Sequence, residues 1–452
     1  MAVPQKNQTL TLKIESLTAE GSGVGRANGF AVFVRGGLPG DTVEAHVIKT
    51  KAHYAVAKVT RILEPSPHRT ENACPLFPRC GGCALREADY AFEAAQKRAR
   101  VEEAFRRLAG LSLPVSEMLV PDSPDRYRNK AQYPVATENG RVVIGFYAPR
   151  THLVVDCTDC LLQPAEFAGI VRVFRTFLEE FGVSVYDPAT GRGLVRHLYL
   201  RKGFQSGEIL VCIVLNGERL PHADALVRRL TAQNGHIASI QLNHNTARTN
   251  VILGGRCTVL WGAAEIADTL CGVRVRLSPL SFYQVNHDMA ERLYEKAAEF
   301  AALTGRETVL DLYCGAGLVG LSMAKGAKRL YGAEIVPEAV ADARRCAAEN
   351  GVQNAEFFCG DAKDAAKRLL EGGARPDVVL LDPPRKGCDE AVLAAVAEMA
   401  PERIVYISCD PATLARDAAR LLSHGYAPVR LACADLFPRT SHVESVCLFA
   451  RC

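Results

Sequence analysis

Hydrophobic and polar positions follow three successive patterns along the chain. Residues 6–63 alternate in short runs, such as 10–14, 31–34 and 57–62, with glycine-rich turns between them. Short alternating strands at this spacing predict a small β-barrel. Prolines at 65 and 67 predict a linker after the last strand. We therefore expect an N-terminal barrel domain over residues 1–66.

The middle of the chain mixes strand patterns with a few helical ones. A basic helical pattern covers 90–110, and strand-like runs such as 141–147, 197–201 and 208–215 follow. This mixture predicts an α+β domain over residues 67–275. Within it, we expect the helical segment at about 91–124 to pack on the domain that follows.

From about residue 285 the pattern becomes a regular alternation of strands and helices, which requires a parallel sheet with helices on both faces. Ligands of such sheets bind at the carboxyl ends of the strands. The short loop between the last two strands predicts that they pair antiparallel. The catalytic domain is placed at 276–452. Strands are expected at 308–312, 329–334, 355–359, 377–381, 403–408, 427–434 and 443–450, and helices at 287–303, 317–325, 337–350, 389–399 and 411–423.

Composition adds little to this picture. The 452 residues exceed the usual size of one core, and 48% hydrophobic with 23% charged residues is ordinary globular usage. No apolar run approaches a membrane span and no secretory signal is visible, so we expect a cytoplasmic protein without a membrane partner. A net charge of +4 neither demands nor excludes nucleic acid. The sixteen cysteines are expected to be reduced, and clustered ones to be metal ligands or nucleophiles.

A glycine-rich loop follows the first strand of the alternating region. Gly315, Gly317 and Gly320 form a G-x-G-x-x-G pattern, which by itself is typical of dinucleotide binding. S-adenosylmethionine needs the same close backbone approach. Acidic residues end the neighbouring strands: Asp311 could reach an amino group, Glu334 the ribose hydroxyls and Asp361 the adenine of an adenosine cofactor.

Three further chemical groups lie at successive strand ends. Cys409 follows the strand at 403–408, Asp382 follows the one at 377–381, and Glu444 opens the last strand. A thiolate can add to C6 of a uracil and so make C5 nucleophilic towards a methyl donor. Glu444 would then remove the C5 hydrogen as a general base. Asp382 could bind the uracil edge or the cofactor, and Arg385 could stabilise the enolate oxygen.

The chain resembles the RNA uracil-C5 (5-methyluridine) methyltransferase family in five motifs. The resemblance covers essentially the whole chain and implies a Rossmann-like class I S-adenosylmethionine-dependent methyltransferase domain. It implies that Cys409 is the nucleophile and Glu444 the base. Leu318 departs from the polar asparagine of some members. It also implies that Gln284, Tyr313, Glu334 and Asp382 contact the cofactor. The five motifs are Ser281-Phe282-Tyr283-Gln284-Val285-Asn286, Asp311-Leu312-Tyr313-Cys314-Gly315, Leu381-Asp382-Pro383-Pro384-Arg385-Lys386-Gly387, Tyr406-Ile407-Ser408-Cys409-Asp410-Pro411 and 435–444.

A separate cysteine cluster lies in the central domain. Four thiolates, Cys74, Cys80, Cys83 and Cys160, would suit zinc or an iron-sulfur cluster, and Cys80 and Cys83 with Cys157 and Cys160 form a rival zinc pattern. Spacing does not choose between them. Ribosomal-RNA members of the family bind a [4Fe-4S] cluster with a similar C-x5-C-x2-C run and a distant fourth cysteine, which implies the first set. Leu161 replaces the usual proline after that fourth cysteine.

The N-terminal barrel is similar to the RNA-binding TRAM domain. Charge and stacking on such a barrel could hold single-stranded RNA, and the target uridine must be extruded to reach a thiol. The candidate contacts are Lys49, Lys51, His53, Tyr54 and Lys58. We therefore expect a monomer that methylates unpaired 23S ribosomal RNA. The alternatives are a tRNA-directed enzyme of the same chemistry and an inactive RNA-binding assembly factor. An NAD-dependent oxidoreductase would leave the other motifs unexplained.

Overall fold

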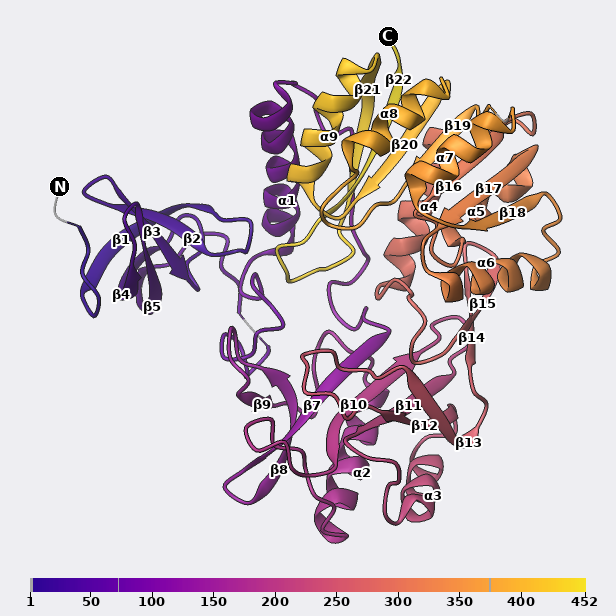
Figure 1. The fold of residues 1–452 in the computed structure, drawn as a ribbon. Coiled ribbons are helices and arrows are strands. Elements are labelled where there is room, and N and C mark those ends of the chain that lie inside the picture. Colours follow the sequence, from indigo (N-terminus) through magenta and orange to yellow (C-terminus); the bar gives the residue numbers. More distant parts are fainter. Residues whose placement is uncertain (1–2, 72, 374) are drawn as a thin grey trace. The chain divides into compact units, whose positions relative to one another are not determined.

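The computed structural model describes residues 3–71, 73–373 and 375–452. The chain divides into two compact units (Figure 1). The first unit comprises residues 1–100, 146–155 and 437–442, and the second comprises 101–145, 156–436 and 443–452. Each unit is described separately below.

The first unit contains the predicted barrel. Its five strands close in the order β1-β2-β3-β5-β4. Alternate residues point inward, so that Leu12, Val32, Val43 and Ala57 are almost fully buried, as an alternating pattern requires. The strands are β1 (Thr9–Leu17), β2 (Gly23–Ala27), β3 (Phe30–Arg35), β4 (Thr42–Thr50) and β5 (Tyr54–Glu64).

Helix α1 (Tyr90–Ala104) begins in the first unit, and its last turn belongs to the second. There it continues as a π-helical turn, η1 (Phe105–Ala109), which ends at Gly110 in the left-handed conformation. Val101 and Phe105 are fully buried in the core of the second unit. The basic segment at 90–110 is therefore helical as predicted, with a bulged final turn.

A seven-stranded mixed sheet and a small hairpin precede the catalytic region, and all of their residues except 146–155 belong to the second unit. The strand order of the sheet is β13-β12-β11-β10-β7-β8-β9, and the hairpin consists of β14 and β15. Helices α2 (Glu166–Glu180) and α3 (Ala223–Gln233) accompany this sheet. The strands are β7 (Lys130–Glu138), β8 (Arg141–Tyr147), β9 (Val154–Asp156), β10 (Val195–Lys202), β11 (Ile209–Leu215), β12 (Ile237–His244), β13 (Arg256–Gly262), β14 (Ile266–Leu270) and β15 (Val273–Leu277).

An eight-stranded sheet forms the catalytic region, in the order β18-β17-β16-β19-β20-β22-β21-β6. The strands from β18 to β20 pair in parallel, whereas β22 is antiparallel to both β20 and β21. The predicted parallel sheet and its antiparallel final pair are thereby confirmed. The strands are β6 (Glu117–Leu119), β16 (Thr308–Leu312), β17 (Arg329–Glu334), β18 (Ala355–Cys359), β19 (Val378–Leu381), β20 (Arg403–Ser408), β21 (Tyr426–Ala434) and β22 (Glu444–Arg451).

Helices cover both faces of this sheet (Figure 1). One face carries α7, α8 and α9, which share a core with η1. The other carries α4, α5 and α6, so the carboxyl ends of the parallel strands open between two helical layers. The helices are α4 (His287–Ala301), α5 (Leu318–Met323), the short 3₁₀ helix η2 (Ala324–Gly326), α6 (Pro337–Glu349), α7 (Ala362–Glu371), α8 (Glu390–Glu398) and α9 (Pro411–Ser423).

Two elements of the catalytic region were not predicted. Helix α7 fills the stretch between β18 and β19, where no helix was expected. Strand β6 joins the sheet by pairing with β21, whose residues lie more than three hundred positions later. No helix among the described residues is both long and apolar enough to cross a bilayer.

Candidate active site

The glycine loop turns sharply from β16 into α5. Gly315 and Gly317 have φ angles of 54° and 77°, in the left-handed region that glycine adopts without strain. The Glu334 carboxylate at the end of β17 accepts hydrogen bonds from the amides of Gly315 (3.1 Å) and Val336 (2.9 Å). Glu334 is thereby fixed beside the loop, where a cofactor hydroxyl could reach it.

Asp311 is the buried carboxyl of this region. Its Oδ2 accepts from the Gly320 amide at 3.0 Å, whereas its buried Oδ1 has no hydrogen-bond partner. Burial, helped by the nearby Asp382 and Glu334 and opposed by the Gly320 hydrogen bond, raises the pKa of Asp311 to about 8. An unpaired buried oxygen among several carboxyls suits a ligand that brings donors and positive charge, as the amino and sulfonium groups of S-adenosylmethionine do.

Gln284 lies in the loop before α4. The side-chain amide of Asn129 donates to the Gln284 carbonyl at 2.7 Å, and the Asn129 backbone amide donates to Val285 at 2.7 Å. Asn286 caps α4 by accepting from the Met289 amide. Asn129, directly before β7, therefore fixes the loop that carries Gln284.

Two other predicted cofactor contacts lie close to the glycine loop. Tyr313 follows β16 with a φ of 64°, a strained conformation for a residue with a side chain. Asp361 follows β18 and caps α7 by accepting from the Lys363 amide at 2.9 Å. Asp361 is exposed, so its contact with adenine stays a prediction and its structural task is a helix cap.

Cys409 and Glu444 lie at adjoining strand ends. Ser408, the last residue of β20, pairs with Ser445 of β22, so that the next residue on β20 and the preceding one on β22 face each other across the pair. Cys409 is half-buried, whereas Glu444 is only 6% exposed. The register thus brings together a thiol and a carboxyl that are 35 positions apart in sequence.

Asp382 and Arg385 complete this group from the loop after β19. Burial raises the pKa of Asp382 to about 7. Burial also raises the pKa of Glu444, to about 8, with a further contribution from Asp382 and an opposing one from Arg385. The pKa of Cys409 rises to about 11 through burial, then through Glu444, against the opposing charge of Arg385. Asp382, Arg385 and Glu444 are therefore close enough to Cys409 to influence its ionisation.

Helix α9 starts directly after the thiol. Asp410 caps it by accepting from the amides of Ala412 (2.8 Å) and Thr413 (3.3 Å), and Pro411 occupies its first turn. The prediction that Cys409 lies where a strand ends is confirmed. The positive end of the helix dipole adjoins the thiol and favours its anionic form.

The sequence prediction left two residues of this region without a role. Tyr294 on α4 is buried and hydrogen-bonds to Gln284 near Asp382, and burial raises its pKa. Phe282 is 75% exposed, two residues before Gln284. An exposed aromatic ring within a motif is a sequence signal for stacking, but Tyr294 could not be found because a helical tyrosine is usually core.

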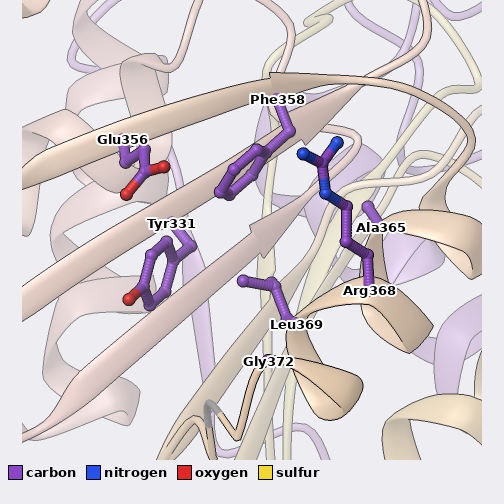
Figure 2. Close-up of a pocket in the computed structure, with 7 residues that line it drawn as sticks. All are labelled: Tyr331, Glu356, Phe358, Ala365, Arg368, Leu369 and Gly372. Atoms are coloured by element: carbon purple, nitrogen blue, oxygen red, sulfur yellow. The ribbon is translucent and has the colours of Figure 1, made fainter.

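A separate cavity of about 210 Å³ lies between α7 and strands β17 and β18 (Figure 2). The Tyr331 and Phe358 rings stack at 6.0 Å, and the Arg368 guanidinium lies over Phe358. None of the predicted site residues lines this cavity, which is bounded by Tyr331, Glu356, Phe358, Ala365, Arg368, Leu369 and Gly372.

The four predicted metal ligands are divided between the two units. Cys74, Cys80 and Cys83 belong to the first unit and Cys160 to the second. Among the residues that the structure describes, no group of three or more histidine, cysteine or acidic residues is arranged to hold a metal ion. The structure therefore gives no support for a cluster at this position.

Local contacts in both cysteine segments nonetheless favour thiolates. The Gly82 amide approaches Cys80 Sγ at 3.4 Å. A hydrogen bond from Cys157 lowers the pKa of Cys160 to about 7, against the effect of burial. A thiol that ionises near neutral pH is a good ligand for a soft metal.

Comparisons with known proteins agree with this geometry. Residues 265–452 match the family described as tRNA (Uracil-5-)-methyltransferase, and residues 5–60 match the TRAM domain. The chain is 42% identical over 444 residues to an uncharacterized RNA methyltransferase of Clostridium tetani, covering 98% of this chain and 96% of the relative. A relative of the same description from Halalkalibacterium halodurans is 42% identical over 442 residues, with 98% and 96% covered.

A solved structure is similar along the whole chain. It is the Pyrococcus abyssi tRNA (uracil-54, C5)-methyltransferase in complex with S-adenosyl-L-homocysteine, with a TM-score of 0.79, 26% identity and coverage of 97% of this chain and 99% of that one. The fold, the TRAM barrel and the cofactor class are thereby shown. The chain belongs to the S-adenosylmethionine-dependent RNA uracil-5-methyltransferase family.

Proposed function

We propose that this enzyme forms 5-methyluridine in RNA through a covalent adduct with Cys409. The observation that carries the proposal is the pairing of Ser408 with Ser445, which sets Cys409 beside Glu444. A thiol and a buried carboxyl at one sheet edge, next to a glycine loop, supply a nucleophile, a base and a cofactor site.

The proposed reaction needs both groups in turn. The Cys409 thiolate bonds to C6 of the uracil, and the C5–C6 π electrons move into the enolate whose negative charge rests on O4. C5 then takes the methyl group from the sulfonium of S-adenosylmethionine, and the electron pair of the broken S–CH₃ bond stays on the sulfur of the S-adenosylhomocysteine product. Glu444 removes the C5 hydrogen, the electrons of that bond restore the C5–C6 double bond, and the C6–S bond breaks to return the thiolate.

The charges of the site fit this sequence of steps. Arg385 lowers the pKa of Cys409 against the larger effect of burial and the charge of Glu444, and it could also stabilise the enolate oxygen. Gln284, Tyr313, Gly315, Glu334 and Asp382 would hold the cofactor, together with Asp311. Exposed Phe282 would stack on an RNA base, because every base offers a π face to an aromatic ring.

The covalent role is tested by Cys409→Ala. We expect methylation to fall by at least about 10³-fold while the cofactor dissociation constant changes little, because the thiol acts on RNA and not on the cofactor. Incorporation of tritiated methyl groups and calorimetric titration with S-adenosylhomocysteine measure the two quantities. Retained turnover in this variant would exclude the covalent mechanism. Cys359→Ala, at an exposed cysteine of the same sheet, is the matched control.

We further propose that Cys74, Cys80, Cys83 and Cys160 hold a [4Fe-4S] cluster, with zinc as the alternative. Support comes from the spacing, the low pKa of Cys160 and the resemblance to ribosomal-RNA enzymes. The cluster has no step in the reaction. Anaerobic purification should yield brown protein with about four iron and four sulfide per chain. Stoichiometric zinc would overturn the iron-sulfur assignment in favour of the alternative, and protein without metal would contradict both.

The RNA substrate has two candidates. The TRAM barrel and the cysteine run favour unpaired 23S ribosomal RNA, with the enzyme acting as a cytoplasmic monomer. The Pyrococcus abyssi structure keeps tRNA as the second candidate, because that tRNA enzyme covers 97% of this chain and the overall architecture therefore does not discriminate between the two RNAs. Mass-spectrometric mapping of 5-methyluridine in both RNAs from a strain without this gene separates them. Loss from 23S RNA alone supports the first candidate, and loss from tRNA supports the second.

A further inference from the structure

A buried carboxylate on α9 accepts hydrogen bonds from two segments of the active site. Asp417 is fully buried. Its Oδ2 accepts from the Tyr406 hydroxyl at 2.7 Å and from the Cys388 amide at 2.8 Å. Its Oδ1 accepts from Arg416 at 2.9 Å and from Arg420 at 3.2 Å. A carboxylate that accepts four hydrogen bonds is held in one position and holds its donors in turn.

The two segments on Oδ2 are those that carry the reaction. Tyr406 lies in β20, three residues before Cys409. Cys388 ends the loop that follows β19, which begins at Asp382 and carries Arg385. Asp417 Oδ2 therefore links the strand that precedes Cys409 to the loop that carries Arg385.

The loop is also shaped to meet this carboxylate. The Gly387 amide donates to the Pro384 carbonyl at 2.8 Å, which closes a tight turn around Arg385, and Arg416 donates to the Lys386 carbonyl at 2.8 Å. Gly387 has a φ of 75°, and a Cβ added there would lie 2.5 Å from Asp417 Oδ2. Only glycine allows so close an approach.

We propose that Asp417 is a positioning residue, which holds the 382–388 loop so that Arg385 stays beside Cys409 and Glu444. The inference rests on the proposed role of Cys409. Arg385 itself is exposed and makes no hydrogen bond that would fix it among the described residues, so its place depends on the turn that carries it. Asp417 would thus act on the reaction through Arg385, without touching substrate or cofactor.

The test measures how fast iodoacetamide alkylates Cys409 at pH 8, by mass spectrometry of the peptide that contains it. Arg385→Ala should slow alkylation about threefold or more, because a cation that favours the thiolate is lost. Tyr406→Phe and Asp417→Asn should slow it by a similar factor. In the Arg385→Ala background, each should add less than about a twofold change, because residues that act through one group are not additive.

The control is Tyr426→Phe, which removes a similarly buried hydroxyl that donates to the Pro401 carbonyl at 2.8 Å. It should leave alkylation unchanged. If Asp417→Asn does not fold, Tyr406→Phe carries the test, because it removes a single hydroxyl. Faster alkylation in Tyr406→Phe would overturn the inference, because it would mean that loosened packing exposes the thiol. Equal slowing with and without Arg385 would also overturn it, because the effect would then not act through Arg385.

Failure of this inference differs from failure of the proposed function. If Cys409→Ala still methylates RNA, the covalent mechanism is wrong whatever the alkylation rates are. If Cys409→Ala is inactive but Arg385→Ala alkylates at the normal rate, the nucleophile stands and the positioning role of Asp417 is wrong.

Discussion

The two sides of the catalytic sheet hold their carboxyl groups in different ways. On the cofactor side, Glu334 accepts from the backbone amides of Gly315 in the glycine loop and Val336 in its own loop. On the reaction side, burial raises the pKa of Asp382 to about 7 and of Glu444 to about 8. Glu334 is satisfied by backbone amides, whereas Asp382 and Glu444, like Asp311 beside the glycine loop, have raised pKa values and an ionisation that depends on what binds there.

This difference explains why the two sides serve different tasks. A cofactor site needs fixed acceptors, and backbone amides fix them at little cost. A base that must take a proton from carbon works best with a pKa near the operating pH, which burial among other carboxyls provides.

The largest expected effect concerns the reaction side. In Glu444→Gln, the thiol should still add to C6 and C5 should still be methylated, but the C5 hydrogen should not leave. We expect turnover to fall by roughly 10² to 10⁴-fold, in the range of a lost general base, and an RNA–protein adduct to accumulate. A denaturing gel with labelled RNA and methyl donor measures the adduct. Only free enzyme and unmodified RNA would contradict the base assignment.

The next prediction concerns the cofactor side. A Cβ at Gly320 would lie 2.8 Å from Asp311 Oδ2 and 2.9 Å from a Leu330 methyl carbon. Gly320→Ala should therefore displace the Asp311 carboxyl and weaken S-adenosylhomocysteine binding about tenfold or more, as calorimetry would measure. Gly326→Ala is the control, because its nearest neighbour would lie at 3.4 Å. Equal affinities in both variants would mean that Asp311 does not contribute to the site.

The smallest expected effect is on stability. The pKa values of Asp382, Glu444 and Asp311 are raised, so the folded protein binds more protons than the unfolded chain at pH values between about 4 and 8. The free energy of unfolding of the ligand-free enzyme should therefore fall as pH rises through this window. Asp382→Asn should reduce the accompanying fall in Tm by roughly 4 °C.

Thermal unfolding at pH 5.5 and pH 8 checks this, with Asp361→Asn as control. That substitution affects an exposed carboxylate on the cofactor side, and asparagine preserves the helix cap. A steeper fall in Asp382→Asn than in the natural protein would show that its carboxyl is ionised in the folded state.

Much of the catalytic fold could be predicted because strand and helix patterns are local. Strands β16, β17, β18 and β20 and helix α9 begin and end where the pattern predicted. Helix α7 lies outside the prediction, and its N-cap is Asp361, the residue that the sequence pattern assigns to adenine. A carboxylate at a strand end serves either task, and sequence spacing does not separate them.

The sequence by itself determined the alternation of the catalytic sheet, the glycine loop and the placing of Cys409, Asp382 and Glu444 at strand ends. Only the tertiary structure decided which strand ends adjoin, because the antiparallel insertion of β22 between β20 and β21 pairs Ser408 with Ser445. It also decided the charge state of the site. Ionisation depends on burial and on neighbours from other segments, such as the loop that Asp417 holds, and a linear pattern carries neither.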